Sequence, residues 1–143
     1  MKFSFDTAII GMKFELAFTM DSKIHQGFID TFNDKNPIHL SDGFAESVGY
    51  KGKVMHGNIL NGFISYFVGE SLKESHLTLI TQSIRYKNPV YLNNVLKLKV
   101  QVKDLSEAGR MYLFVFEFEN ENGQIVADGK FQCCQMLKIN ENG

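Results

Sequence analysis

The sequence contains no tryptophan, only two prolines and only two cysteines among its 143 residues, and its net charge is −1. Such a balanced charge offers no electrostatic attraction to nucleic acid or to an anionic membrane. No apolar run approaches the roughly 20 residues that a membrane-spanning helix needs. We therefore expect neither nucleic acid nor a membrane as a partner.

The two cysteines, Cys133 and Cys134, are neighbours in the sequence. Neighbouring residues of a strand point to opposite faces, so a bridge between them would be strained and we expect reduced thiols. Residues 1–6 lack the apolar core of a signal peptide. Both observations predict a cytoplasmic protein. Without a repeat, low-complexity tract or linker, the length predicts a single domain over residues 1–143.

Apolar residues are plentiful, at 44% of the chain with 13 phenylalanines, so a real core can form. Alternating apolar residues predict a first strand over 13–20. Asp21 or Ser22 can then cap a helix, which should end before Asn36 because residues preceding a proline avoid helical angles. Ser41 can cap a second, short helix. Its expected inward-facing residues are Phe44, Ala45 and Val48.

The longest helical pattern extends from Gly57 to about Leu72, with a wide apolar stripe that predicts deep burial. Gly62 and Gly69 interrupt it, at a cost of about 1 kcal/mol each relative to alanine. Close approach of a surrounding sheet would explain two such small residues. The stripe consists of Ile59, Leu60, Phe63, Ile64, Phe67, Val68 and Leu72.

Four further strands follow this helix in the sequence. Their expected ranges are 76–87, 96–103, 111–119 and 124–137. The strand over 96–103 alternates strictly between apolar and polar residues, which predicts one buried and one wet face. Asn122-Gly123 is a strong hairpin signal between the last two strands.

This order of elements predicts an α+β fold of one curved antiparallel sheet wrapped around a long central helix. That arrangement is the hotdog fold. Because the edges of such a sheet are left unpaired, we expect pairing with a second copy of the chain, and thus a homodimer.

The first candidate catalytic residues are Asp34 and His39, which lie on either side of the rigid turn at Pro37. A carboxylate and an imidazole aimed into one space could hold a water, take its proton and return a proton elsewhere. Spacing alone leaves open the alternative that Asp34 caps the turn and His39 is an ordinary surface residue.

His56-Gly57 stands at the start of the long helix, where unpartnered N–H groups and the helix dipole favour negative charge. An oxygen that gains charge during a reaction would be stabilised there, although a plain junction between loop and helix would have the same sequence. Ser65, two turns on, could face a pocket or bond back to the Asn61 carbonyl.

The remaining histidines, His25 and His76, show no partner pattern and are predicted to be surface residues. Asp34, His39 and His56 could together bind a metal in principle. Their spacing matches no established metal signature, so we predict no metal.

Several short blocks of the sequence resemble the MaoC-like, (R)-specific enoyl-CoA hydratase family. The resemblance extends over about 11–137, and its specific feature is the aspartate-to-histidine block joined to a downstream His-Gly. The blocks are Phe32-Asn33-Asp34-Lys35-Asn36-Pro37-Ile38-His39, Phe44-Ala45, Gly49-Tyr50 and Val54-Met55-His56-Gly57.

The resemblance implies hydration of a trans-2-enoyl thioester to an (R)-3-hydroxyacyl thioester, or the reverse dehydration, on coenzyme A or acyl carrier protein. It implies a homodimer, no cofactor, and Asp34 and His39 as the catalytic pair. The Gly57 N–H would polarise the thioester carbonyl. The residues expected to bind substrate or the developing charge are Asn36, His56, Gly57 and Ser65. The chain departs from the usual family pattern with Asn33 in place of a glycine.

Two other functions are consistent with the same sequence. A thioesterase on the same fold would release a free thiol, whereas a hydratase leaves the thioester intact. A binding module for acyl thioesters would not need both Asp34 and His39, so their joint presence argues against it.

Overall fold

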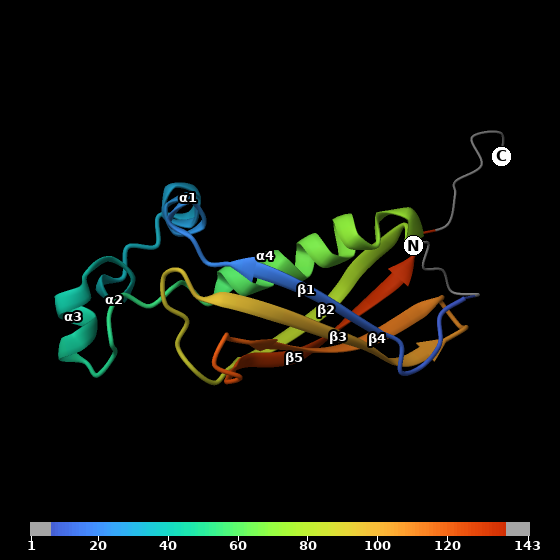
Figure 1. The fold of residues 1–143 in the computed structure, drawn as a ribbon. Coiled ribbons are helices and arrows are strands. Elements are labelled where there is room, and N and C mark those ends of the chain that lie inside the picture. The colour runs from blue at the N-terminus through green and yellow to red at the C-terminus, as the bar shows by residue number, and fades with distance from the viewer. Residues whose placement is uncertain (1–6, 137–143) are drawn as a thin grey trace.

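The computed structural model of the chain describes residues 7–136, in which five strands form one antiparallel sheet (Figure 1). The order across the sheet is β1-β3-β4-β5-β2, so β1 and β2 are its edges. All five predicted strands are present; the expected end of the last one at Leu137 lies outside the described residues. The strands are β1 (Lys13–Thr19), β2 (Leu77–Tyr86), β3 (Val95–Ser106), β4 (Met111–Glu119) and β5 (Ile125–Gln135).

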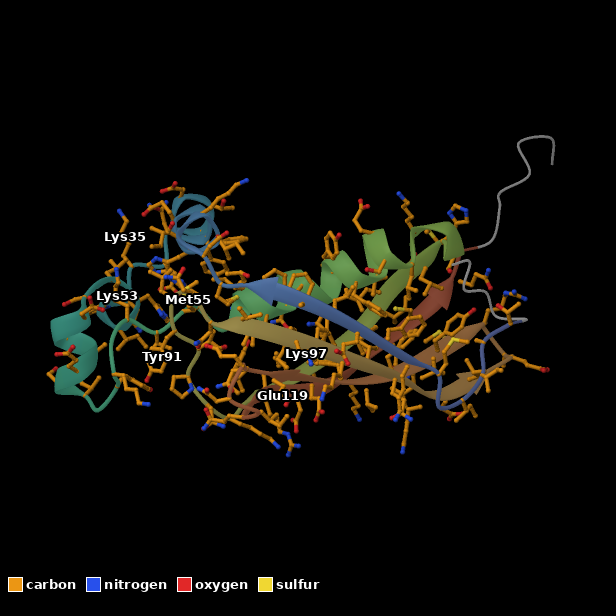
Figure 2. The ribbon with its side chains drawn as sticks, in the orientation of Figure 1. Lys35, Lys53, Met55, Tyr91, Lys97 and Glu119 are labelled. Atoms are coloured by element: carbon orange, nitrogen blue, oxygen red, sulfur yellow. The ribbon has the colours of Figure 1, made fainter. Side chains whose placement is uncertain are left out.

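The two faces of the sheet separate apolar from charged side chains, as the alternation in β3 predicts. On the buried face, Phe114, Phe116 and Phe118 of β4 are at most 4% exposed. On the other face lie Lys97 and Glu119, which are register partners on β3 and β4 (Figure 2). The apolar face therefore faces the core, where the central helix covers it.

The central helix is α4 (Asn58–Tyr66), which continues through a π-helical turn, η1 (Phe67–Ser71), and a short 3₁₀ turn, η2 (Lys73–Ser75). The predicted helix from Gly57 to Leu72 is therefore interrupted near its end. Six of the seven predicted stripe residues are at most 6% exposed, and Phe63 is half-buried.

The explanation for the two helix glycines was wrong. Gly62 and Gly69 are exposed, and a β carbon built on either would meet no atom within 4 Å. Neither glycine is therefore required by close contact with the sheet. Gly62 instead opens onto a cavity beside the candidate site.

Three short helices gather at the end of the sheet where α4 begins (Figure 1). They are α1 (Ser22–Phe32), α2 (Pro37–Leu40) and α3 (Asp42–Ser47). Asp21 and Ser41 cap α1 and α3 as predicted, by accepting from the N–H groups of Ile24 and Phe44.

Two expectations for this region need correction. The proline turn is itself a helix, α2, because Pro37 occupies the first helical position, where its missing N–H costs nothing. In α3 only Ala45 is buried, whereas Phe44 and Val48 are 42% and 53% exposed. The helix extends away from the sheet and leaves these two side chains without a covering layer.

Both cysteines are free thiols, as predicted. They lie on β5 with Cys133 in the core and Cys134 half-buried, which is the opposite-face arrangement expected of strand neighbours. Burial raises the pKa of the Cys133 thiol to about 12, so this thiol is a core residue and not a nucleophile. In the described part of the chain, no helix is long and apolar enough to span a membrane.

A matched pair of glycine substitutions tests the sheet packing. A β carbon at Gly129 would overlap the Ser83 carbonyl oxygen and lie 3.0 Å from Cα of Ile84, so β5 would have to move away from β2. We expect Gly129→Ala to lower the free energy of unfolding by about 3 kcal/mol. Gly62→Ala should raise it by up to about 1 kcal/mol, because alanine favours the helix and nothing obstructs it. Urea unfolding of both variants measures this, and equal effects would contradict the packing.

Candidate active site

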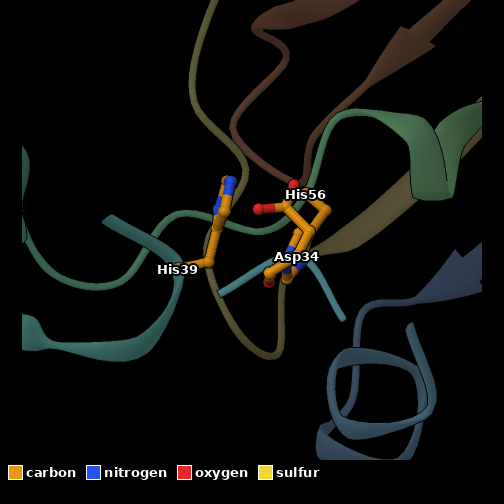
Figure 3. Close-up of side chains that lie close together, drawn as sticks. All are labelled: Asp34, His39 and His56. Atoms are coloured by element: carbon orange, nitrogen blue, oxygen red, sulfur yellow. The ribbon is translucent and has the colours of Figure 1, made fainter. Parts of the chain in front are cut away.

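Asp34, His39 and His56 come together between the short helices and the start of α4 (Figure 3). One side-chain atom from each residue, a carboxylate oxygen or a ring nitrogen, lies within 4.8 Å of the others. Asp34 is exposed, whereas His39 and His56 are 9% and 2% exposed. The structure therefore brings the predicted carboxylate and imidazole into one space and adds a second imidazole.

The turn that carries Asp34 is shaped by asparagines. Asn33 ends α1 in the left-handed region, with φ of 56°, a conformation that asparagine tolerates better than most residues. This conformation explains why a glycine suits the same position. Asn36 caps α2 by accepting from the Ile38 N–H, and the Asp34 carboxylate accepts from the Asn36 N–H at 3.2 Å. Asn36 thus shapes the turn, and its predicted contact with substrate stays a prediction.

His39 lies on α2 with its ring fixed from two sides. Its Nδ1 is 2.7 Å from the Val54 carbonyl oxygen. Because a carbonyl only accepts, Nδ1 carries the proton, and in the neutral ring Nε2 is left as the basic nitrogen. The ring also stacks on His56 at a centroid distance of 3.9 Å. The orientation leaves one defined nitrogen for proton transfer.

His56 is the most buried of the three groups. Its Nε2 donates to the Asp34 carbonyl oxygen at 2.9 Å, and its ring packs between those of His39 and Phe28. Burial holds the pKa of the His56 imidazole below its ordinary value, and the neighbouring His39 and His25 lower it further. The bond to the Asp34 carbonyl and the Asp34 charge oppose this shift in pKa. Nδ1 of His56 is buried without a hydrogen-bond partner among the described residues.

The prediction that His25 is a surface residue was wrong. His25 is 9% exposed, and its Nε2 donates to the His39 carbonyl oxygen at 2.8 Å. A signal was present in the sequence, because His25 and the buried Ile29 are four residues apart on one face of α1. His76 is exposed, as predicted.

The segment before α4 is anchored to its neighbours by backbone hydrogen bonds. The Val54 N–H donates to the Ile38 carbonyl, and the Met55 N–H donates to the Val90 carbonyl at 2.7 Å. Met55 is also 3% exposed. These contacts fix where His56 and Gly57 enter the helix.

Gly57 is the N-cap residue of α4, with no side chain capping the first turn. A β carbon here would lie 2.8 Å from Cε1 and Cζ of Tyr86, so a larger residue would displace the tyrosine ring from its present position. The Tyr86 hydroxyl is 3.4 Å from Oδ1 of Asn58. Because Gly57 directly follows His56, the N-terminus of α4, which is the positive end of its dipole, adjoins the candidate site.

Two cavities meet at this helix end. One, of about 820 Å³, lies between α1 and α4 and has Asp34 in its lining; the other, of about 500 Å³, is bordered by His39, His56 and Gly57. Ser65 is exposed on α4 and lines neither of them, so its predicted role stays a prediction. The larger cavity is lined by Ile24, Gly27, Phe28, Phe32, Asp34, Asn58, Ile59, Gly62, Phe63 and Tyr66.

Asp34, His39 and His56 are also the residues here that could hold a metal ion. The stacked rings of His39 and His56 do not favour it, because nitrogen lone pairs lie in the ring planes and two nearly parallel planes do not converge on one ion. Two ring nitrogens are already bonded to backbone carbonyls. The expectation that no metal or other cofactor takes part remains a prediction.

Residues 5–117 match the sequence model of the MaoC like domain family, and the chain belongs to that family. Among curated relatives, the 3-hydroxybutyryl-CoA dehydratase of Methylorubrum extorquens is 33% identical over 79 residues, which are 55% of this chain and 50% of the relative. The (R)-specific enoyl-CoA hydratase of Aeromonas caviae is 23% identical over 121 residues, 85% of this chain and 90% of the relative. The match thus spans about half the length of the first relative.

Solved structures confirm the predicted hotdog fold. The (R)-hydratase from Aeromonas caviae has a TM-score of 0.83 at 22% identity, covering 91% of this chain and 98% of that one. An R-hydratase from Pseudomonas aeruginosa also has a TM-score of 0.83 at 22% identity, covering 96% and 91%. At this identity the likeness establishes the fold alone.

The lowered pKa of His56 predicts how stability depends on pH. Between the folded pKa and the ordinary value of 6.5, the unfolded chain binds a proton that folded His56 resists, so stability falls as pH drops through this window. We expect His56→Leu to flatten the decline of melting temperature below about pH 6.5. His76→Leu, which alters an exposed imidazole, should leave the slope unchanged. Parallel curves for wild type and His56→Leu would contradict the assignment.

Proposed function

We propose that this protein is a hydro-lyase that hydrates trans-2-enoyl thioesters to (R)-3-hydroxyacyl thioesters, or catalyses the reverse dehydration. The observation that carries the proposal is the convergence of Asp34, His39 and His56 beside the N-terminus of α4. A proton-transferring pair and a site for negative charge are the two parts that this reaction requires. The names of the curated relatives support the same class of reaction.

In the hydration direction, water binds between Asp34 and His39. The water oxygen bonds to the β carbon of the substrate as the carbon–carbon π bond opens. One water proton passes to the pair, and the pair delivers a proton to the α carbon, so one water is added overall. His39 takes part through Nε2, because Nδ1 is bonded to the Val54 carbonyl.

As the π bond opens, charge moves onto the thioester oxygen as an enolate. The N–H of Gly57, at the positive end of α4, would stabilise that oxygen. A donor of this kind contributes about 3 kcal/mol to transition-state stabilisation in other enzymes. Neither step requires a metal or an organic cofactor.

The acyl chain would occupy the cavity between α1 and α4. Its volume of about 820 Å³ lies within the range of small-molecule sites, and its lining is mostly apolar with Asp34 beside it. The carrier is coenzyme A or acyl carrier protein. Relatives named for each carrier are found, among them a mitochondrial 3-hydroxyacyl-[acyl-carrier-protein] dehydratase of Arabidopsis thaliana.

We further propose that two copies pair through the β2 edge of the sheet. β2 is bonded to β5 on one side only, which leaves a row of backbone groups on the other side. Ile80 of β2 is 50% exposed at an irregularity in the pairing with β5, and Tyr86 is 52% exposed. A second copy would satisfy the backbone groups and cover these side chains.

The proposed location is the cytoplasm. Both cysteines are free, and free thiols persist in a reducing compartment. Cys134 is only half-buried, so it would be open to oxidation elsewhere.

Hydration of crotonyl-CoA, followed by the loss of its conjugated absorbance, tests the proposed reaction. We expect Asp34→Asn and His39→Gln each to lower kcat/KM by a factor of about 10² to 10⁴, the usual contribution of a general acid or base. Asp30→Asn, which alters an exposed carboxylate on α1, is the matched control and should keep wild-type activity.

The products distinguish the alternatives in the same assay. Release of free thiol, detected with a thiol reagent, would identify a thioesterase instead. Binding of the enoyl thioester without turnover would identify a binding module. Wild-type turnover in both Asp34→Asn and His39→Gln would show that the pair does not carry the reaction.

Light scattering on a sizing column tests the pairing through β2. We expect wild type at about twice the chain mass of 16.3 kDa. Ile80→Lys should shift the mass toward one chain, because a charge at a paired edge opposes association. Val48→Lys places the same charge on the exposed residue that follows α3 and should not change the mass. A monomeric wild type, or a dimeric Ile80→Lys, would rule out this interface.

A further inference from the structure

Three imidazoles in the site region share one unusual arrangement: each ring N–H donates to a backbone carbonyl of a different segment. His25 of α1 donates to the carbonyl of His39, at 2.8 Å. His56 donates to the carbonyl of Asp34, at 2.9 Å. His39 itself donates to the carbonyl of Val54, at 2.7 Å. The main-chain carbonyls of Asp34 and His39, the proposed reacting pair, thus each accept a hydrogen bond from another histidine.

The need for such donors follows from the shape of the region. α2 has only four residues, so the carbonyls of its last turn cannot all be bonded within the helix. The His39 carbonyl is one of these, and the N–H of His25 satisfies it. Asp34 lies in the loop between α1 and α2, where no ladder of secondary structure holds its carbonyl. The N–H of His56 supplies the bond there.

These bonds also fix the tautomers of both rings. A carbonyl oxygen can only accept, so Nε2 of His25 and Nε2 of His56 must carry protons. His39 has the opposite tautomer, with its proton on Nδ1. Because His39 and His56 stack at 3.9 Å, a displacement of the His56 ring would also displace the reacting imidazole.

We propose that His25 and His56 are positioning residues for the Asp34–His39 pair. Their ring N–H groups hold the main-chain carbonyls of His39 and Asp34, and thereby fix where the two reacting side chains point. The inference rests on the proposed function, since only there are Asp34 and His39 the reacting pair. Misplacement of a reacting group by about 1 Å can cost a factor of about 10² in rate.

A purely space-filling role would make a different prediction, and His25 separates the two roles cleanly. His25 lines neither cavity at the helix end, so its replacement leaves their lining residues unchanged. Leucine has a volume close to that of histidine but no donor. Glutamine carries an amide N–H at nearly the position of Nε2. If the hydrogen bond matters, glutamine should replace histidine and leucine should not.

Steady-state kinetics of crotonyl-CoA hydration provides the first arm of the test. We expect His25→Leu to lower kcat at least about tenfold with KM within about twofold of wild type, and His25→Gln to restore kcat to within about threefold. His76→Gln is the control with an exposed imidazole. Circular dichroism and melting temperature establish that each variant is folded. Equal kcat in His25→Leu and His25→Gln would overturn the inference.

Nitrogen NMR of the histidine rings provides a second arm that needs no activity. We expect the neutral rings of His25 and His56 to carry their proton on Nε2, and the neutral ring of His39 to carry it on Nδ1. In His25→Leu the His39 Nδ1–H should exchange faster with water, and in His25→Gln it should keep its wild-type protection. Equal exchange in the two variants, or a mixture of tautomers at His25 and His56 in wild type, would overturn the inference.

The two arms separate the failure of this inference from the failure of the proposed function. A wild type without hydratase activity, together with the expected ring tautomers and exchange rates, would refute the reaction and leave the positioning of His39 standing. An active wild type with full kcat in His25→Leu would refute the positioning role and leave the reaction standing.

Discussion

The burial of one face of α4 against the sheet is the contact on which the rest of the structure depends. Ile64 of α4 is fully buried, and Phe67, which follows directly in η1, is 1% exposed and packs edge-on against Phe114 and Phe131 of the central strands. Once that face is buried, the helix direction is fixed, and so is the position of its N-terminus at one end of the sheet. The segments before α4 must then fold over this end, which brings the loop of Asp34 and the helix of His39 to the positive end of α4. A rigid scaffold thus positions residues that lie on short, irregular segments.

Those short segments contain too little regular structure to satisfy their own polar groups, and buried imidazoles compensate. Burying a carbonyl without a partner costs about 1 to 3 kcal/mol, so the bonds from His25 and His56 stabilise the region as well as orient it. The same burial makes the charged form of His56 unfavourable and lowers its pKa. Stability and site geometry are therefore coupled here: the groups that hold the segments together are the groups that surround Asp34 and His39, the proposed reacting pair.

The strands, and the meeting of Asp34 and His39 in one space, could be predicted from the sequence for a definite reason. Period-two alternation in β3 and β4 reports directly which face is buried, and the blocks around Asp34 and His56 are specific in combination. The features that could not be predicted depend on contacts between segments that are far apart in the sequence. The exposure of Phe44, the open space beside Gly62 and the burial of His25 are decided by which segments cover them. A pattern within one helix shows that residues share a face, but not what that face meets.

The contrast between scaffold and site also explains how the fold persists at 22% identity to the Aeromonas caviae structure. The sheet and α4 require only apolar residues at the right period, and many residues meet that requirement. The site is less permissive, because a β carbon at Gly57 would displace the Tyr86 ring and Nδ1 of His39 must face a carbonyl. His25 belongs neither to the apolar scaffold nor to the proposed reacting residues. It occupies a position of α1 that packing alone would give to an apolar side chain. Its hydrogen bond to the His39 carbonyl supplies a reason for a polar residue at that position, because this bond joins α1 to the short helix that carries His39.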